Sequence, residues 1–159
     1  MSTIRAALTL CVLALTAAPA AADLTGFIGT ATSPSSRPVR GAAFGIGLLI
    51  VGFEFEFADV SEDVPTGAPA LRTGMGNVLL QTPVPIMGIQ PYFTSGGGVY
   101  RERLGSDTET NIGMNNGGGV KIKVAGPLRV RLDYRVFTLR GSPRASPVHR
   151  LYAGANLAF

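Results

Sequence analysis

The chain is poor in the residues that carry most site chemistry. Among its 159 residues it has one cysteine, one histidine and no tryptophan. One cysteine cannot form an intrachain disulfide, and no group of His, Cys or carboxylate residues has metal-ligand spacing. Lysine is limited to Lys121 and Lys123, so the formal charge of +4 comes without a basic run. We therefore expect no catalytic residue, cofactor or metal, and no nucleic-acid partner.

Long apolar runs are also missing, apart from the first residues. The N-terminus has a positive charge at Arg5, an apolar stretch over 6–18 and small residues at Ala20–Ala22. This order is typical of a secretory signal peptide, and the apolar stretch is shorter than the ~20 residues of a membrane-spanning helix. We predict a signal peptide over 1–22, cleaved after its last alanine, with a retained anchor helix as the alternative.

The remaining chain is unusually apolar for a water-soluble domain. The mean hydropathy is +0.29 and only 15% of residues are charged. The best later candidate for a spanning helix, residues 41–53, contains four glycines and runs directly into Glu54. An apolar chain without such a helix can still cross a membrane as a closed β-barrel, in which every backbone group is paired between strands.

Period-2 alternation supports strands throughout residues 23–159. Phe53, Phe55 and Phe57 alternate with glutamates, and the segments 120–124, 128–136 and 150–159 alternate in the same way. Turn residues then divide the chain into eight predicted strands, at 24–32, 40–48, 51–60, 70–81, 87–102, 111–125, 128–140 and 148–159. The predicted fold class is all-β, an eight-stranded antiparallel transmembrane β-barrel in a single domain.

The predicted connections differ in length. Those near 49–51, 83–86 and 125–127 are short, whereas those near 33–39, 61–69, 103–110 and 141–147 are longer and polar. Membrane barrels combine short periplasmic turns with longer extracellular loops. With an even number of strands, both termini are expected on the periplasmic side.

The charged rows opposite the apolar ones are expected to face the lumen. A buried charge needs a partner, so an enclosed polar interior requires both signs. The predicted lumenal polar network is Glu54, Glu56, Lys121, Lys123, Arg129, Arg131, Asp133 and Arg135. Glycines at 45, 47, 96 and 98 would leave room for these side chains. The alternative is an ordinary charged surface on a soluble periplasmic barrel that binds a small ligand.

The last strand ends in an aromatic residue, with Leu151 and Leu157 on the same alternating row as Phe159. Together with the signal peptide and eight strands, this resembles the small outer-membrane barrels of the OmpA and OmpX type over the whole chain. The resemblance implies that Tyr152, Leu157 and Phe159 form the signal read by the barrel-assembly machinery. It also implies a monomer in the cell outer membrane, in contact with outer-membrane lipid and with lipopolysaccharide as a candidate partner.

Interfacial aromatic residues are few, and the candidates are Phe27, Phe44, Tyr92, Phe93, Tyr100 and Tyr134. The loop arginines Arg37, Arg40, Arg140 and Arg144 are candidates for contacts with lipopolysaccharide phosphates or are simply solvated charges.

One enzymatic alternative is left open by His149. It lies close to Ser146 in sequence, with Glu102 or Asp107 as a third member, and this combination could serve a lipid A-modifying esterase. The triple glycines at 96–98 and 117–119 fit close packing better than phosphate binding. We favour a non-enzymatic envelope protein with a structural role or with loops that mediate interaction or adhesion.

Overall fold

The computed structural model describes residues 21–159. The expected signal peptide lies outside the described residues except for Ala21 and Ala22, which begin the first strand. Ala22 exchanges two backbone hydrogen bonds of 2.9 Å with Phe159. No helix in the described part of the chain is long and apolar enough to cross a membrane.

Eight strands form the fold, as the alternation predicted, and seven of them match the predicted ranges to within three residues at each end. The strands are β1 (Ala21–Ala31), β2 (Arg37–Leu48), β3 (Val51–Val60), β4 (Ala70–Gln81), β5 (Ile89–Leu104), β6 (Asp107–Ala125), β7 (Leu128–Leu139) and β8 (Val148–Ala158). A single 3-10 turn, η1 (Val64–Thr66), lies between β3 and β4.

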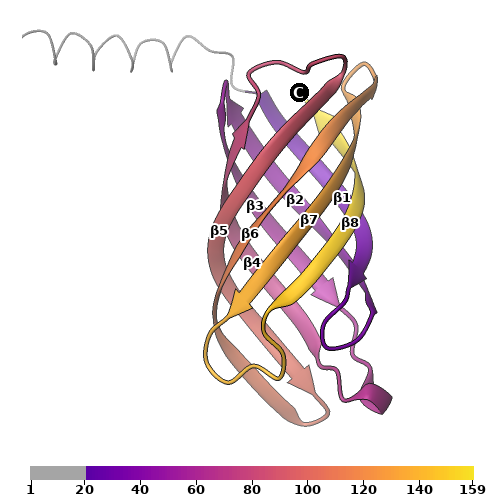
Figure 1. Ribbon diagram of the computed structural model, residues 1–159, viewed down its shortest axis with the longest axis vertical. Helices are drawn as coiled ribbons and strands as arrows, with labels where there is room; N and C mark the ends of the chain where they lie inside the picture. Colours follow the sequence, from indigo (N-terminus) through magenta and orange to yellow (C-terminus); the bar gives the residue numbers. More distant parts are fainter. Residues whose placement is uncertain (1–20) are drawn as a thin grey trace, which may run out of the picture.

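The strands form one closed antiparallel barrel in chain order (Figure 1). Each strand pairs with its neighbours in sequence, and β1 closes the barrel by pairing with β8 from Asp23↔Ala158 to Ala31↔Arg150. Closure leaves no sheet edge unpaired, which a structure surrounded by lipid requires because no water is present to bond a free edge.

The two ends of the barrel differ. At one end of the barrel, the terminus end, β1 begins and β8 ends. The connections 49–50, 82–88 and 126–127 lie at the same end (Figure 1). At the opposite loop end lie the connections 32–36, 61–69, 105–106 and 140–147. The 49–50 turn places the bulky Leu49 at φ 55°, a conformation that such residues rarely adopt.

Two connections depart from the predicted lengths. The expected loop at 103–110 is a two-residue turn, because β5 and β6 continue past it as a hairpin whose last pair is Leu104↔Asp107. Gly105, at φ 60°, occupies its first central position, where type II′ hairpin turns require glycine. Conversely, the expected short join at 83–86 extends over residues 82–88, because β5 begins only at Ile89.

The faces of the barrel are inverted relative to a water-soluble one. The outward row of β3 is Phe53, Phe55 and Phe57, each more than half exposed, while Glu54 and Glu56 between them are buried. The same holds on β7, where Leu132 faces outward and Arg131 inward. An apolar exterior around a charged interior is the arrangement of a transmembrane barrel, and it does not fit the soluble-barrel alternative.

Candidate functional site

The lumen contains a compact cluster of charged side chains at mid-height. Arg131 binds Glu54 through both terminal nitrogens of its guanidinium group, and its Nη2 lies 2.8 Å from Oδ2 of Asp133. Arg135 bridges three carboxylates: its Nη2 lies 2.8 Å from Glu54 Oε1, its Nε 3.0 Å from Asp133 Oδ1, and its Nη1 3.0 Å from Glu56 Oε2. All five side chains are at most 1% exposed. The structure thus brings together five of the eight predicted network residues.

Neutral side chains complete this cluster. The Tyr92 hydroxyl donates to Asp133 Oδ2 and accepts a 2.6 Å hydrogen bond from Nε of Arg131. Asn77 donates to Glu54 Oε1 at 3.3 Å and accepts from Asn115 at 2.8 Å. These bonds satisfy carboxylate and guanidinium groups that would otherwise be costly to bury. The residues come from β3 to β7, so only closure of the barrel brings them together.

A third arginine, which the sequence analysis did not single out, extends the cluster toward the loop end. Arg150 is fully buried; its Nη1 donates to the Thr73 hydroxyl at 3.0 Å and lies 4.0 Å from Glu56 Oε1. Its guanidinium carbon lies 4.0 Å from the centre of the Phe137 ring. Arg150 alternates with the outward Leu151, so the same period-2 pattern could have identified it.

The other three predicted network residues lie nearer the terminus end. Lys121 is buried and pairs with Asp23, which the sequence analysis did not include. Arg129 is half-buried and donates to Gln90 Oε1 at 3.3 Å. Lys123 does not join the network: it is exposed because it lies at the barrel rim, beside a register shift between Lys123 and Ala125.

The loop-end half of the lumen contains an apolar cluster, which the charge pattern did not predict. Val39, Leu71, Met75 and Phe137, among others, form a buried cluster inside the barrel. Above it, Arg37 is only 3% exposed; its guanidinium group donates to the backbone carbonyls of three loop-end residues, Ser33, Ser61 and Pro69. The expectation that Arg37 projects from a loop toward lipopolysaccharide is therefore wrong, because it begins β2 on the inward face.

Inward glycines allow the lumen to pack this tightly. A Cβ at Gly98 would lie 2.0 Å from the carbonyl oxygen of Gly74, and one at Gly96 would lie 2.2 Å from Oδ1 of Asn77. At Gly117 a Cβ would lie 2.1 Å from the Tyr134 carbonyl oxygen. The two triple-glycine segments thus meet a packing requirement of the strands, as the sequence analysis favoured.

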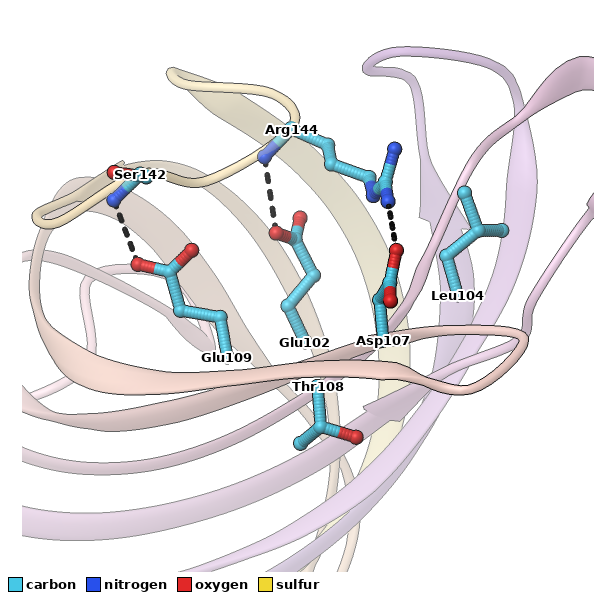
Figure 2. A pocket seen from close by; sticks show the side chains of 7 residues that line it. All are labelled: Glu102, Leu104, Asp107, Thr108, Glu109, Ser142 and Arg144. Atoms are coloured by element: carbon cyan, nitrogen blue, oxygen red, sulfur yellow. Dashed lines mark hydrogen bonds and ion pairs between the residues drawn. The ribbon is translucent and has the colours of Figure 1, made fainter.

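Hydrogen bonds and ion pairs tie the loop-end segments to one another. Figure 2 shows Glu102 and Glu109 accepting backbone hydrogen bonds from Arg144 (2.9 Å) and Ser142 (2.6 Å), while the Arg144 guanidinium lies 3.0 Å from Asp107. These contacts hold the 140–147 loop against the β5–β6 hairpin around a hollow of about 330 Å³.

A second set of contacts fixes the 61–69 loop. Glu62 accepts a 2.7 Å hydrogen bond from the backbone N–H of Gly105 and lies 3.6 Å from Arg103. Ser35 and Thr66 share a 3.1 Å hydrogen bond that joins the 32–36 loop to the same segment. The loop end therefore presents a connected polar surface.

The histidine–serine combination is not assembled as a catalytic pair. His149 Nδ1 lies 2.7 Å from the Tyr134 hydroxyl on the outward face. The Ser146 hydroxyl accepts a 3.0 Å hydrogen bond from the backbone N–H of Leu139. Within residues 21–159 no hydrogen bond joins His149 to Ser146, and Glu102 bonds the backbone of Arg144 instead.

The expected assembly residues lie on two faces. Leu157 and Phe159 are exposed on the outward face of the last strand region. Tyr152 is 3% exposed, lies inside the lumen, stacks on Phe27 and donates a 2.7 Å hydrogen bond to Glu56. Tyr152 is an even-numbered residue in a strand whose odd positions face outward, so it cannot share a face with the other two.

The expected interfacial aromatics divide in the same way. Phe44, Phe93 and Tyr134 face outward, whereas Phe27, Tyr92 and Tyr100 are buried in the lumen. Only three of the six candidates can therefore contact lipid headgroups. The outward phenylalanines of β3 and Phe159 add to the exposed aromatic surface.

Comparison with solved structures places this architecture among known barrels. Over 88% of the chain, the barrel superposes on the crystal structure of Neisserial surface protein A (NspA) with a TM-score of 0.69 and 16% identity, covering 97% of that chain. The N-terminal β-barrel domain of Pseudomonas aeruginosa OprF gives a TM-score of 0.67 and 14% identity over 87% of this chain and 97% of that one. The chain has the fold of the small eight-stranded outer-membrane barrels.

The same fold also occurs in an enzyme. The outer membrane enzyme PagL matches with a TM-score of 0.53 and 12% identity over 85% of this chain and 98% of that chain. No protein-family model and no curated protein sequence matches the chain. At these identities the likeness establishes the small-barrel fold, and the role of this barrel must be argued from its own residues.

Proposed function

We propose that this protein is a non-conducting, non-enzymatic barrel of the outer membrane that acts as a structural envelope component and through the surface of its loop end. In this proposal the terminus end faces the periplasm and the loop end faces the cell exterior, because membrane barrels have short periplasmic turns and longer extracellular loops. The outward apolar rows and the outer-membrane origin of the similar structures support this location.

The observation that carries the proposal is the filled lumen. Arg131, Arg135 and Arg150 are at most 1% exposed and occupy its centre with their carboxylate partners. On the loop side, the apolar cluster and Arg37 are also buried in the lumen. An eight-stranded barrel is just wide enough to be filled by side chains, so we expect it to pass neither ions nor nutrients.

The loop end supports a role in surface interaction. Its segments are joined by hydrogen bonds and ion pairs around Glu62, Glu102 and Glu109, so they form one ordered polar surface. A binding surface that is ordered before contact avoids the entropy cost of ordering flexible loops. The barrel-assembly machinery is the expected partner during insertion, through the outward row that includes Leu157.

The proposal is tested by expressing the wild type and a variant whose segments 62–68 and 141–146 are replaced by short Gly-Ser linkers. Both proteins should fractionate with the outer membrane and migrate faster unheated than heated on a denaturing gel. We expect planar bilayers containing either protein to show no conductance. Cells that express the linker variant should aggregate or adhere less than cells that express the wild type. A water-soluble wild type or stable single-channel currents would overturn the proposal.

A further inference from the structure

A row of outward-facing charges crosses four neighbouring strands, β2 to β5, at the loop end of the barrel. Cross-strand pairing sets Arg40 of β2 opposite Asp59, Asp59 opposite Arg72 of β4, and Arg72 opposite Arg101 of β5. Arg101 is in turn opposite Thr110 of β6. The side chains of Arg40 and Arg72 are 81% and 65% exposed.

This row contains more positive charge than its carboxylates can neutralise. Asp59 pairs with two arginines: its Oδ1 lies 2.8 Å from Arg72 Nε and its Oδ2 lies 3.8 Å from Arg40 Nη2. Glu62 pairs with Arg103, one outward position beyond Arg101. Within the described residues Arg101 forms no ion pair, and the residue directly opposite it is another arginine, Arg72. Like charges placed directly opposite on neighbouring strands destabilise a sheet unless an anion lies between them.

The arginines surround a hollow at the edge of the apolar surface. Its volume is about 410 Å³, and it is lined by Asp59, Glu62, Arg72, Arg101 and Arg103, among others. The next outward row toward the terminus end contains Phe57, Val99 and Ile112, each more than half exposed. The hollow therefore lies where the apolar belt ends, which is the depth of lipid headgroups in a membrane-spanning barrel.

A strip of outward-facing glycines begins one cross-strand row from this hollow and enters the apolar belt. Gly74, Gly76 and Gly97 face outward on β4 and β5 and leave the floor of this strip without side chains. Phe55 and Met114 stand on either side in the same cross-strand row. An apolar hollow of about 370 Å³ lies beside Gly76 against Phe44, Phe53, Phe55 and Val78.

Barrel packing does not require glycine at these outward positions. A Cβ at Gly76 would come no closer than 3.8 Å to any other atom, and one at Gly74 no closer than 3.9 Å. The inward Gly98 contrasts with them, since its Cβ would collide with backbone at 2.0 Å. Glycine also weakens a strand, because it adds entropy to the unfolded chain and packs no side chain. The outward glycines thus leave a groove that costs stability and that lipid can fill.

We propose that this face binds one phosphorylated glycolipid of the outer leaflet, of the lipid A class. Its phosphate would occupy the hollow between Arg72, Arg101 and Arg103, and one acyl chain would lie along the glycine floor. Guanidinium groups suit this role because they pair with phosphate through two hydrogen bonds at once. The inference rests on the proposed outer-membrane location and orientation, and it adds a specific lipid site to them.

The test uses the full-length barrel purified in detergent, with native mass spectrometry to count bound lipid and thermal unfolding to measure stabilisation. The probes are bisphosphorylated lipid A, the same lipid after removal of both phosphates, and inorganic phosphate. Arg101→Gln removes one phosphate ligand, and Gly76→Val fills the groove. The matched controls are Lys123→Gln, an exposed cation at the opposite end, and Gly26→Val, an outward glycine on β1 whose Cβ would meet nothing within 4 Å.

We expect wild type and both controls to retain one bisphosphorylated lipid A and to unfold at a higher temperature when it is present. Arg101→Gln should bind about tenfold more weakly, the loss of one charge-assisted hydrogen bond. Without lipid it should be at least as stable as wild type, because the repulsion from Arg72 is relieved. Gly76→Val should also reduce binding while keeping the folded gel mobility.

Several outcomes would overturn the proposal. If dephosphorylated lipid A bound as tightly as the bisphosphorylated lipid, the arginines would not be phosphate ligands. If inorganic phosphate stabilised the barrel as much as lipid A does, the groove would not bind an acyl chain. If the control variants lost lipid as strongly as the test variants, the lipid would be bound non-specifically around the barrel. If the wild type formed dimers that Gly76→Val lost, this face would be a contact between two barrels. Gel mobility and membrane fractionation of every variant report separately on whether the barrel itself inserts.

Discussion

Replacing Arg131 by leucine should strongly destabilise the barrel. Arg131 is 1% exposed and bonds Glu54, Asp133 and the Tyr92 hydroxyl. The central cluster is balanced, with Glu54, Glu56 and Asp133 against three arginines, so the change leaves one buried negative charge in excess. Removing one partner from a buried pair costs about 3–5 kcal/mol of unfolding free energy.

A double variant separates the pair from its surroundings. Adding Glu54→Leu to Arg131→Leu restores the balance of charge, while Arg135 keeps its contacts with Glu56 and Asp133. The double variant should therefore recover about 0.5–3 kcal/mol of the loss, the usual range of coupling between contacting residues. Arg129→Leu is the matched control, because Arg129 is only half-buried and makes one 3.3 Å hydrogen bond.

The measurement is reversible unfolding in urea, with the barrel in lipid vesicles. Since the chain has no tryptophan, unfolding must be followed by circular dichroism or by gel mobility. The control should change stability by less than about 1 kcal/mol. An Arg131→Leu variant as stable as the control would refute a lumen held together by this cluster. A double variant no more stable than the single would show that the two side chains are not coupled.

Further predictions concern the outward face, the orientation and the remaining alternatives. Leu132→Arg should cost about 2–4 kcal/mol in the same unfolding assay, because it places a charge in the lipid; a silent change would mean that this face meets water. A biotin-acceptor tag at Pro65 should be labelled from outside intact cells and one at Gly126 should not, whereas the reverse pattern would invert the orientation. His149→Ala should leave lipid A composition, read by mass spectrometry, unchanged, and a lost deacylation would restore the esterase alternative. Phe159→Asp should lower the outer-membrane level on immunoblots while export continues, and a normal level would argue against a role of this residue in assembly.

The strand pattern was accessible from the sequence because alternation is a local property. Phe53 to Phe57 and Leu128 to Val136 alternate so regularly that their inward and outward faces could be assigned from the chain alone. The same alternation would have placed Tyr152 and Arg150 in the lumen. The resemblance of the last strand to an assembly signal grouped Tyr152 with Leu157 and Phe159, and the structure places Tyr152 on the opposite, inward face, against Glu56.

Strand ends were harder to predict because turn residues do not always interrupt a sheet. The segment 103–110 is polar, yet its backbone continues the β5–β6 ladder to Leu104↔Asp107. Arg37 follows a serine- and proline-rich segment and therefore read as a loop residue. Its burial depends on loop carbonyls contributed by residues up to 32 positions away, which no local pattern encodes.

By itself, the sequence determined which side chains share a face, because a strand turns successive residues to opposite sides whatever its neighbours are. It could not determine which rows meet, since that depends on the register between strands and on closure of β1 against β8. Register sets Arg72 opposite Arg101, and closure brings Glu54, Arg131 and Arg135 together across the lumen. Burial then fixes their pairing, because inside a narrow barrel the partners of a charge are limited to the side chains that the other strands present.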